Sequence, residues 1–514
     1  MPLLNNMAES SNNKRIAKNT IFLYIRMGII MIVQLYTSRK ILEILGVEDY
    51  GIWSVIATFV ISISFITNPL ASATQRFLNI ELGKRNEKGA QDIFSESLVI
   101  YGFFSICLFL LFETVGLWFI NTKMSIPSEK LYVTNWVYQC SILSFIITIL
   151  RIPYDATLIA YEKFNFYAIF GIIEVILRLV IVFSLLLFNS ISHLLLYGIL
   201  TGVESLILVF VLKVYCEQHF GITKFKWLWN KILIKDLLSF SGWSTFGAFS
   251  NMTANQGLSI LINLFFGVSV NAAMGLANQV GGAINQFVTN FQTAFQPQIT
   301  KNYACGNNEE LTRLMLSTSK ISFFLLFIIG CPVIFNIRTL LNLWLTEVPE
   351  YTTDFCIYII MIAMIEAVGA PFWMAIQAVG RIMKYQIAIS LTLLTTIIFS
   401  LLLFQLGWAP QTALIIKTAI AFVCLLIRLL FVRSLISFQI RIFFLKVIMP
   451  LFILSMIGCG VFLLLPILVS LPAISYLITS TIVFITIIGF SGWYLLFSYQ
   501  QRMSIMAIVK SKLK

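Results

Sequence analysis

Ionisable side chains interrupt several long apolar runs of this 514-residue sequence. In the stretch FGIIEVILRLVIVF (170–183) the only charged residues are Glu174 and Arg178, four positions apart. Five more ionisable residues have similar surroundings: Arg26, Glu204, Glu366, Lys417 and Arg428. A charge at the centre of a bilayer costs at least ~2.5–3.5 kcal/mol, so each of these residues indicates a function or a partner in the fold.

The cations among them are suited to binding an anion. Lys417 and Arg428 are eleven residues apart, close to three helical turns, and therefore share one helix face at different depths. Neither has an acid within four residues in the sequence. The two therefore form a ladder of cations along a path, which predicts that they line a cavity. The alternative is that the long side chains snorkel to the membrane surface.

The acids allow two interpretations. Glu174 and Arg178 have the (i, i+4) spacing of a helical ion pair, which would neutralise both charges, but the pair could also line a cavity. Glu204 and Glu366 have no nearby cation in the sequence, so one of them is a candidate site for a proton or another cation. The alternative is a protonated carboxyl that packs inside the protein.

Amide side chains gather in the segment 237–299. One helical stripe contains Gln279, Gln286, Asn290 and Thr293, and a second, roughly 120° round the helix, contains Asn285, Gln292 and Gln296. Amides join neighbouring helices in membranes, which accounts for one stripe. The other is expected to face water or a sugar-like ligand, and the predicted polar lining is Asn255, Gln256, Gln279, Gln286 and Asn290.

The composition that surrounds these residues is that of a membrane protein. Hydrophobic residues make up 59% of the chain and charged residues 11%, and the mean hydropathy is +0.92, whereas soluble domains carry roughly 25% charged residues. A helix needs about 20 mainly apolar residues to cross a bilayer. Fourteen such spans are predicted, at 19–38, 51–74, 93–120, 131–152, 165–188, 192–213, 237–266, 271–299, 319–341, 352–379, 385–406, 411–433, 444–468 and 474–499.

Loop charges predict the orientation of these spans. With both termini in the cytoplasm, inner loops hold 26 of the 35 Lys and Arg residues and outer loops hold 5. This asymmetry follows the excess of positive charge that marks cytoplasmic loops. The polar, basic N-terminus precedes an apolar run without a small-residue cleavage site, so we expect a retained first helix.

The longest inner loop divides the chain. We expect an N-terminal lobe at 1–215, a cytoplasmic loop at 216–236, a C-terminal lobe at 237–434, and two accessory spans with a cytoplasmic tail at 435–514. The stretch KFKWLWNK (224–231) predicts an amphipathic helix on the inner leaflet. An offset of 221 residues pairs Gly46 with Gly267, Ala73 with Ala294, Gln75 with Gln296 and Asn86 with Asn307, which predicts a parallel internal repeat.

Three stretches resemble one family. They are RFLNIELGKRN (76–86), PYDATLIAYEKFNFYA (153–168) and FGVSVNAAMGLANQVGGAINQFVTNFQTAFQPQITKNYA (266–304). They resemble bacterial polysaccharide flippases, the Wzx-type O-antigen and capsule translocases of the multidrug/oligosaccharidyl-lipid/polysaccharide exporter superfamily. The resemblance covers predicted spans 1–12.

The resemblance implies an all-α polytopic membrane protein with 14 transmembrane helices. Two six-helix lobes would form a V-shaped, MATE-like arrangement, plus two accessory C-terminal helices. It implies alternating access in the bacterial inner membrane, with undecaprenyl-pyrophosphate-linked oligosaccharide repeat units moved to the periplasmic leaflet. Arg26, Arg178, Lys417 and Arg428 would receive the pyrophosphate or acidic sugars.

The implied partners are the lipid-linked oligosaccharide, membrane lipids, a polysaccharide polymerase and glycosyltransferases, and no nucleic acid. No cofactor or metal is expected. The resemblance implies coupling to a proton or sodium gradient, with Glu174, Glu204 and Glu366 as the candidate coupling residues.

Three other functions remain open. A multidrug exporter of the same superfamily takes mostly cationic substrates, so its cavity should be rich in acids. A flippase for the cell-wall precursor lipid II would share the span count and the cationic cavity. A membrane enzyme of glycan assembly is disfavoured because the predicted outer loops are short and no metal-ligand or nucleophile motif is present.

Overall fold

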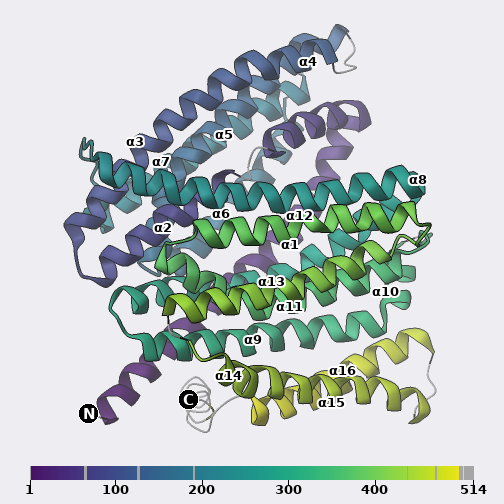
Figure 1. The fold of residues 1–514 in the computed structure, drawn as a ribbon. Coiled ribbons are helices and arrows are strands. Elements are labelled where there is room, and N and C mark those ends of the chain that lie inside the picture. Colours follow the sequence, from purple (N-terminus) through teal and green to yellow (C-terminus); the bar gives the residue numbers. More distant parts are fainter. Residues whose placement is uncertain are drawn as a thin grey trace. The chain divides into compact units, whose positions relative to one another are not determined.

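The chain folds into helices joined by short loops (Figure 1). The computed structural model describes residues 2–62, 66–123, 128–188, 192–345, 347–436, 438–468, 472–496 and 502, and no strand occurs within these ranges. Two compact units form, one from Asn19–Ala248 and one from Phe249–Lys514 with Met1–Lys18. We call them the N-unit and the C-unit. The all-α class is confirmed, and the unit boundary lies inside a helix, about a dozen residues beyond the predicted 216–236 loop.

The helices of the N-unit begin with a long, kinked one. In chain order they are α1 (Pro2–Ser62, shared with the C-unit), α2 (Thr67–Gly83), α3 (Glu87–Leu111), the π-helical turn η2 (Phe112–Gly116), α4 (Leu117–Lys123), η3 (Ser128–Lys130), α5 (Leu131–Ala160), α6 (Phe164–Leu185), α7 (His193–His219) and η4 (Gly221–Thr223). Helix α5 packs against α2, α3 and α7, and α6 packs against α7.

The C-unit continues from the second long helix. Its elements are α8 (Lys231–Ala304, shared with the N-unit), α9 (Asn308–Phe335), α10 (Ile337–Trp344), α11 (Thr352–Val379), α12 (Met383–Gln405), α13 (Thr412–Ile436), α14 (Ile440–Phe443), η5 (Phe444–Ile448), α15 (Met449–Leu468) and α16 (Ala473–Leu495). Helix α11 packs against α9 and α13, and α15 and α16 pack against α9.

The backbone has matching geometry at two of the residue pairs in the predicted repeat. Gly46 and Gly267 kink α1 and α8 with nearly identical angles, φ 75° and ψ 170° against φ 83° and ψ −178°. Only glycine adopts this region readily. Asn86 and Asn307 each cap the following helix, with Oδ1 accepting a hydrogen bond from the N–H three residues on. The residue before each cap is left-handed in both units, at Arg85 and Gly306.

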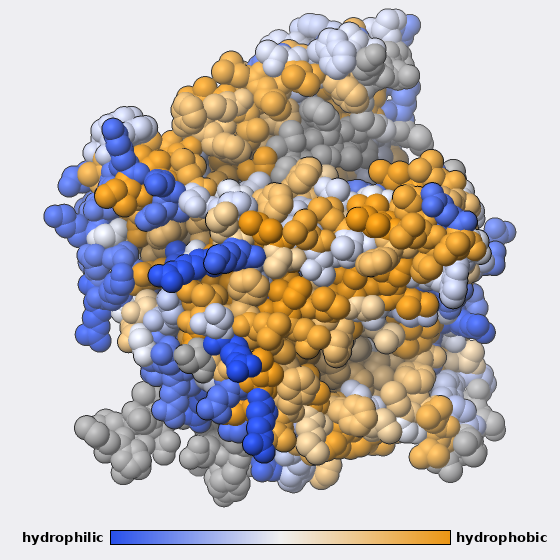
Figure 2. Space-filling view, in the orientation of Figure 1, coloured by the Kyte–Doolittle hydropathy of each residue, from blue (hydrophilic) through white to orange (hydrophobic). Residues whose placement is uncertain are grey.

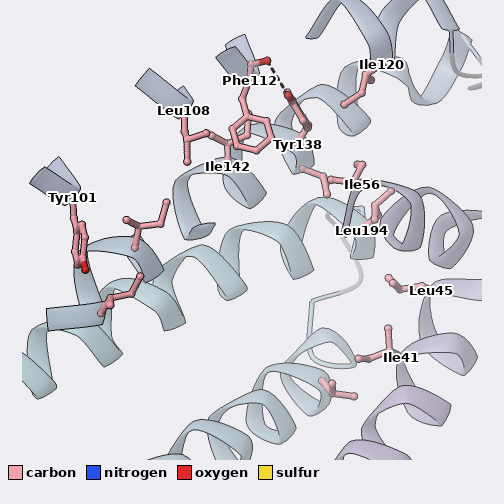
Figure 3. Close-up of a cluster of buried hydrophobic side chains, with 14 of the residues drawn as sticks. Ile41, Leu45, Ile56, Tyr101, Leu108, Phe112, Ile120, Tyr138, Ile142 and Leu194 are labelled. Atoms are coloured by element: carbon pink, nitrogen blue, oxygen red, sulfur yellow. Dashed lines mark hydrogen bonds between the residues drawn. The ribbon is translucent and has the colours of Figure 1, made fainter. Parts of the chain in front are cut away.

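Apolar contacts hold each unit together. In the N-unit, one buried cluster joins α1, α3, α5 and α7, with Tyr138 and Ile142 at its centre (Figure 3). The π-helical turn interrupts the regular hydrogen bonding of α3, and the Tyr138 hydroxyl donates to the carbonyl oxygen of Phe112 at 2.8 Å. In the C-unit, a cluster centred on Leu258, Phe355 and Leu414 joins α8, α11 and α13.

Eleven helical segments of the described chain are long and apolar enough to span a membrane. In the view of Figure 2, hydrophobic residues cover most of the visible surface. The predicted count of fourteen is not confirmed, because 51–74, 237–266 and 271–299 are outside this set. Residues 63–65 of the first lie outside the described ranges. The other two are the halves of α8, which are helical but rich in Asn, Gln, Ser and Gly.

The predicted amphipathic helix at 224–231 is wrong. Residues 224–230 form no helix, and α8 begins only at Lys231. Side chains of α3 bind the backbone of this segment instead, because Lys224 O accepts from Gln91 and the N–H of Lys226 donates to Ser95 Oγ. These tertiary hydrogen bonds replace the internal ones that a helix would supply.

Candidate functional site

A chain of ion pairs runs through the N-unit. Glu174 accepts from Arg178 Nη2 at 3.0 Å, which is the predicted (i, i+4) pair. Its other oxygen accepts from Arg151 Nη1 on α5 at 3.1 Å. Arg151 Nε lies 2.9 Å from Asp155 Oδ2, and Arg178 Nε lies 3.4 Å from Glu204 Oε1 on α7. Three helices therefore contribute to one network of alternating charge.

Exposure varies along this network. The Arg178 side chain is 50% exposed, whereas that of Glu204 is 6% exposed and that of Arg151 is 14% exposed. The guanidinium of Arg151 also lies 4.9 Å from the centre of the Phe170 ring. The network thus has a buried part at Arg151 and an accessible end at Arg178.

Arg26 lies next to the same network. Its guanidinium stacks over the Tyr167 ring, 4.4 Å from the centroid, and its charge acts on Asp155. Gly171 makes the space for it, because a Cβ there would overlap the Arg26 side chain. With Arg26 included, three cations face three carboxylates, so the group is balanced in formal charge.

Lys417 and Arg428, the predicted cations of the C-unit, have uncharged hydrogen-bond partners. Lys417 Nζ on α13 donates to Asn255 Oδ1 on α8 at 2.7 Å, and Asn255 is fixed by a hydrogen bond to the Asn251 carbonyl oxygen at 2.9 Å. Arg428 Nε donates to Tyr385 Oη on α12 at 3.2 Å. A Cβ on Gly369 would lie 2.6 Å from Arg428 Nη1, so α11 makes room for this guanidinium.

Glu366 is the acid that belongs with this second group. It is exposed on α11, and its charge acts on both Lys417 and Arg428. In the part of the chain that the structure describes, the Glu366 carboxylate forms no ion pair with Lys417 or Arg428. The C-unit group therefore has two cations for one carboxylate, spread about 16 Å along α13.

The two amide stripes of α8 differ in burial. Gln292 is buried and donates to Ser322 Oγ at 3.3 Å and to the Ala367 carbonyl at 3.4 Å, so it joins α8 to α9 and α11. Gln279, Gln286 and Gln256 are exposed, and Asn290 is half-buried. The stripe that contains Gln279 and Gln286 is thus free to meet a ligand or water.

Two members of the N-unit network are absent from the sequence-based predictions. Arg151 lies at the end of the predicted span 131–152 and counts among the inner-loop charges, and Asp155 lies beyond that end, yet the structure places both on α5, inside one candidate span. Their (i, i+4) spacing across the predicted end of the span is the available signal. That span prediction ended too early, because Pro153 does not terminate α5.

No metal centre is evident in the part of the chain that the structure describes, since no three His, Cys, Asp or Glu residues there are grouped to hold an ion. His219 Nδ1 donates to the Tyr215 carbonyl oxygen, and its ring stacks on the Tyr215 ring, so it has a structural role.

Comparison with known proteins identifies the architecture. No protein-family model and no curated protein matches the sequence. Solved structures do match, among them a MATE in the straight conformation, with a TM-score of 0.70 and 15% identity over 83% of this chain and 96% of that chain. The chain has the MATE transporter fold.

Further MATE-fold neighbours have different reported properties. An outward-facing multidrug resistance MATE family transporter of the MOP superfamily gives a TM-score of 0.68, with 14% identity over 83% of this chain and 96% of that one. A MOP superfamily transporter from Pyrococcus furiosus, described as having a binding pocket of reverse polarity, gives 0.64, with 15% identity over 82% and 96%. At these identities the likeness concerns the fold, and with the apolar helices it makes this a multi-pass membrane protein.

Proposed function

We propose that this chain is a membrane transporter that flips an anionic, lipid-linked oligosaccharide, with undecaprenyl pyrophosphate as the carrier, from the cytoplasmic to the periplasmic leaflet. The proposal rests on the hydrogen-bond partners of Lys417 and Arg428. Both are anchored by neutral oxygens and keep their charge available. Arg151 and Arg178 of the N-unit, by contrast, are already paired with carboxylates.

The spacing of the two cations suits a moving anion. Eleven residues of α-helix separate them by about 16 Å along α13, too far for one pyrophosphate to contact both. They therefore mark two successive positions along a path. At each position a charge-assisted hydrogen bond offsets part of the cost of removing the pyrophosphate from water. The lipid tail stays in the bilayer throughout.

The exposed amides support the sugar part of this proposal. Asn255, Gln256, Gln279 and Gln286 offer donors and acceptors on α8. Hydroxyl groups need both, and side-chain amides supply both without adding charge. Asn255 has a second task, because it also holds Lys417.

Energy coupling would involve the N-unit network. A proton or sodium ion that neutralised Glu204 would release Arg178 from one of its two partners. Arg178 is the accessible member and Glu204 the buried one. We propose this exchange of partners as the coupling step, with Glu174 keeping Arg178 in place.

A cationic-drug exporter is the second candidate. It is favoured by the exposed Glu366 and by the neighbour described as a multidrug resistance transporter. The neighbour described as having reverse pocket polarity supports the view that this fold serves substrates of either charge. The two candidates predict opposite consequences of removing the cations.

The test is a chromosomal deletion complemented with charge variants. We expect the deletion strain to accumulate lipid-linked oligosaccharide on the inner leaflet and to lose surface polysaccharide, and the Lys417→Ala/Arg428→Ala double variant to restore less than a tenth of it at normal protein level. Lys384→Ala, which removes an exposed cation at the start of α12, should restore it fully. Unchanged surface polysaccharide with increased retention of cationic dyes would establish the exporter instead.

A further inference from the structure

The segment that replaces the expected amphipathic helix forms a strap across the end of α3. The strap comprises residues 224–230, KFKWLWN. Gln91 Nε2 donates to the Lys224 carbonyl at 2.8 Å, the Lys226 N–H donates to Ser95 Oγ at 3.2 Å, and the Asn230 N–H donates to Glu96 Oε1. Ser95 and Glu96 are fully buried, so the strap is held at points inside the protein.

The strap ends where α8 begins. Asn230 Oδ1 accepts from the N–H groups of Ile232 and Leu233 at 3.1 and 3.3 Å and so caps that helix. Its other end follows η4, whose Ile222 and Thr223 are buried. Both ends and the middle are therefore fixed, which gives the strap a defined outer surface.

That outer surface is aromatic. Phe225, Trp227 and Trp229 alternate along the strap and are 50%, 73% and 65% exposed. The rings of Phe225 and Trp227 meet edge to face, with centroids 6.3 Å apart. Contiguous exposed aromatic groups of this size need an apolar partner, and tryptophan prefers the boundary between membrane and water.

Cations accompany these rings. Lys224, Lys226, Lys231 and Lys235 are all exposed, and the strap itself contains no acid. The carboxylate next to it, Glu96, is turned inward to the Asn230 N–H. The strap also lies at the membrane boundary, because it connects to the end of the α7 span and lies on the first turns of the α3 span.

We propose that the strap is a binding site for anionic phospholipid headgroups of the cytoplasmic leaflet. Phe225, Trp227 and Trp229 enter the headgroup layer, and Lys224, Lys226 and Lys231 contact lipid phosphates. The charge of the surface matches an anionic leaflet, and its rings match the interfacial layer. The site is separate from the transported substrate, so it stands or falls independently of the proposed function.

The position of the rings is tested in nanodiscs with the full-length protein. The fluorescence lost in Trp227→Phe/Trp229→Phe, relative to the wild type, is the emission of these two residues. We expect a spin label on the phosphatidylcholine headgroup to quench it and iodide in the buffer to leave it unquenched. Quenching by iodide without quenching by the lipid label would overturn the proposal, and an acidic protein partner as the occupant would give that result.

The lysines are tested by titrating the detergent-solubilised protein with phosphatidylglycerol and counting bound lipid by native mass spectrometry. Lys224→Gln/Lys226→Gln/Lys231→Gln should weaken binding at least about tenfold at low salt. The control Arg338→Gln/Arg381→Gln/Lys384→Gln removes the same charge from exposed residues of the C-unit and should change binding less than about twofold. Equal losses in the two triple variants would contradict a site at the strap. Thermal unfolding shows whether each variant stays folded.

Discussion

Arg151 illustrates how a buried charge is tolerated in this fold. Its guanidinium contacts Asp155 and Glu174 at 2.9 and 3.1 Å, and the side chain is largely buried. Removing one partner of a buried network leaves the others without compensation, which typically costs about 3–5 kcal/mol. Arg178 is half-exposed, and Glu174 keeps its bond to Arg151 when Arg178 is removed.

We therefore expect Arg151→Ala to destabilise the protein by about 3–5 kcal/mol, and Arg178→Ala by about 1 kcal/mol or less. Thermal or denaturant unfolding in detergent measures both. Arg151→Lys, which keeps the charge, should recover part of the loss. Equal destabilisation by the two alanine variants would show that the network is not organised around Arg151.

Asn255 offers a second prediction, which rests on the proposed function. Asn255→Ala removes the acceptor that holds Lys417, so the ammonium group would no longer be positioned on the path. We expect export of surface polysaccharide to fall severalfold while the unfolding temperature changes little. Gln256→Ala is the comparison, because Gln256 is the neighbouring exposed amide of the same proposed lining but does not hold Lys417, so export should fall less. Equal losses in both variants would mean that any amide there serves, and that Lys417 needs no anchor.

Local spacing made part of the site predictable. The Glu174–Arg178 pair follows from four residues of separation on one helix. The contacts of Glu174 with Arg151 and of Arg178 with Glu204 span 23 and 26 residues, and depend on how α5, α6 and α7 pack. No periodicity in one sequence contains that information. The same holds for the Lys417–Asn255 bond, which spans 162 residues.

At the scale of the element, the kinks of α1 and α8 are the clearest feature. Each long helix consists of two helical segments that meet at a glycine with positive φ and non-helical backbone angles. The offset of 221 residues predicted that Gly46 and Gly267 correspond, but it did not predict a kink. Glycine is tolerated in straight membrane helices as well, so its identity alone did not reveal the conformation.

Alanine at either kink should be costly. A residue with a Cβ pays about 1–3 kcal/mol in this backbone region, so Gly46→Ala and Gly267→Ala should lower the free energy of unfolding by similar amounts. Gly28→Ala is the control on α1, because Gly28 has ordinary helical geometry and open space around its Cα. That change should be neutral or stabilising by about 0.5–1 kcal/mol. A neutral Gly46→Ala would mean that the kink is not maintained.

The strap shows why an amphipathic pattern failed as a predictor. Aromatic residues occupy every second position in the middle of KFKWLWNK. This pattern also matches an extended segment with one apolar face. Buried acceptors on α3 decided between the two structures by binding the backbone N–H groups of Lys226 and Asn230. The pattern within this segment contains no information on hydrogen-bond partners about 130 residues away in the sequence.

At the scale of the whole molecule, apolar runs predicted most of the helices and the all-α class. The three predicted spans outside the eleven candidate segments lie in α1, α2 and α8, where apolar and polar residues mix. In α8 the amides that make it a candidate site are the same residues that lower its hydropathy. This overlap accounts for two of the three spans that the hydropathy criterion leaves out.

Orientation remains a prediction, and α12 offers a matched pair for testing it. Lys384 and Trp408 flank this helix and are both exposed. In a cysteine-free background, we expect an impermeant maleimide applied to whole cells to label Trp408→Cys readily. Lys384→Cys should react only after permeabilisation, because the positive-inside asymmetry places it in the cytoplasm. The reverse pattern would invert the predicted topology.

The kink glycines and capping asparagines that match between the two units bear on how such a protein evolves. Gly46 and Gly267, and Asn86 and Asn307, repeat the same backbone geometry, whereas Arg151 corresponds to no cation in the C-unit and the network there is built from different residues. In a saturation-mutagenesis map, substitutions should therefore have similar effects at the matched glycines and asparagines of the two units. They should have different effects at the charged positions. On the proposed function, the charged groups of one unit can change while those of the other stay as they are, so substrate preference and energy coupling can evolve separately in the two units.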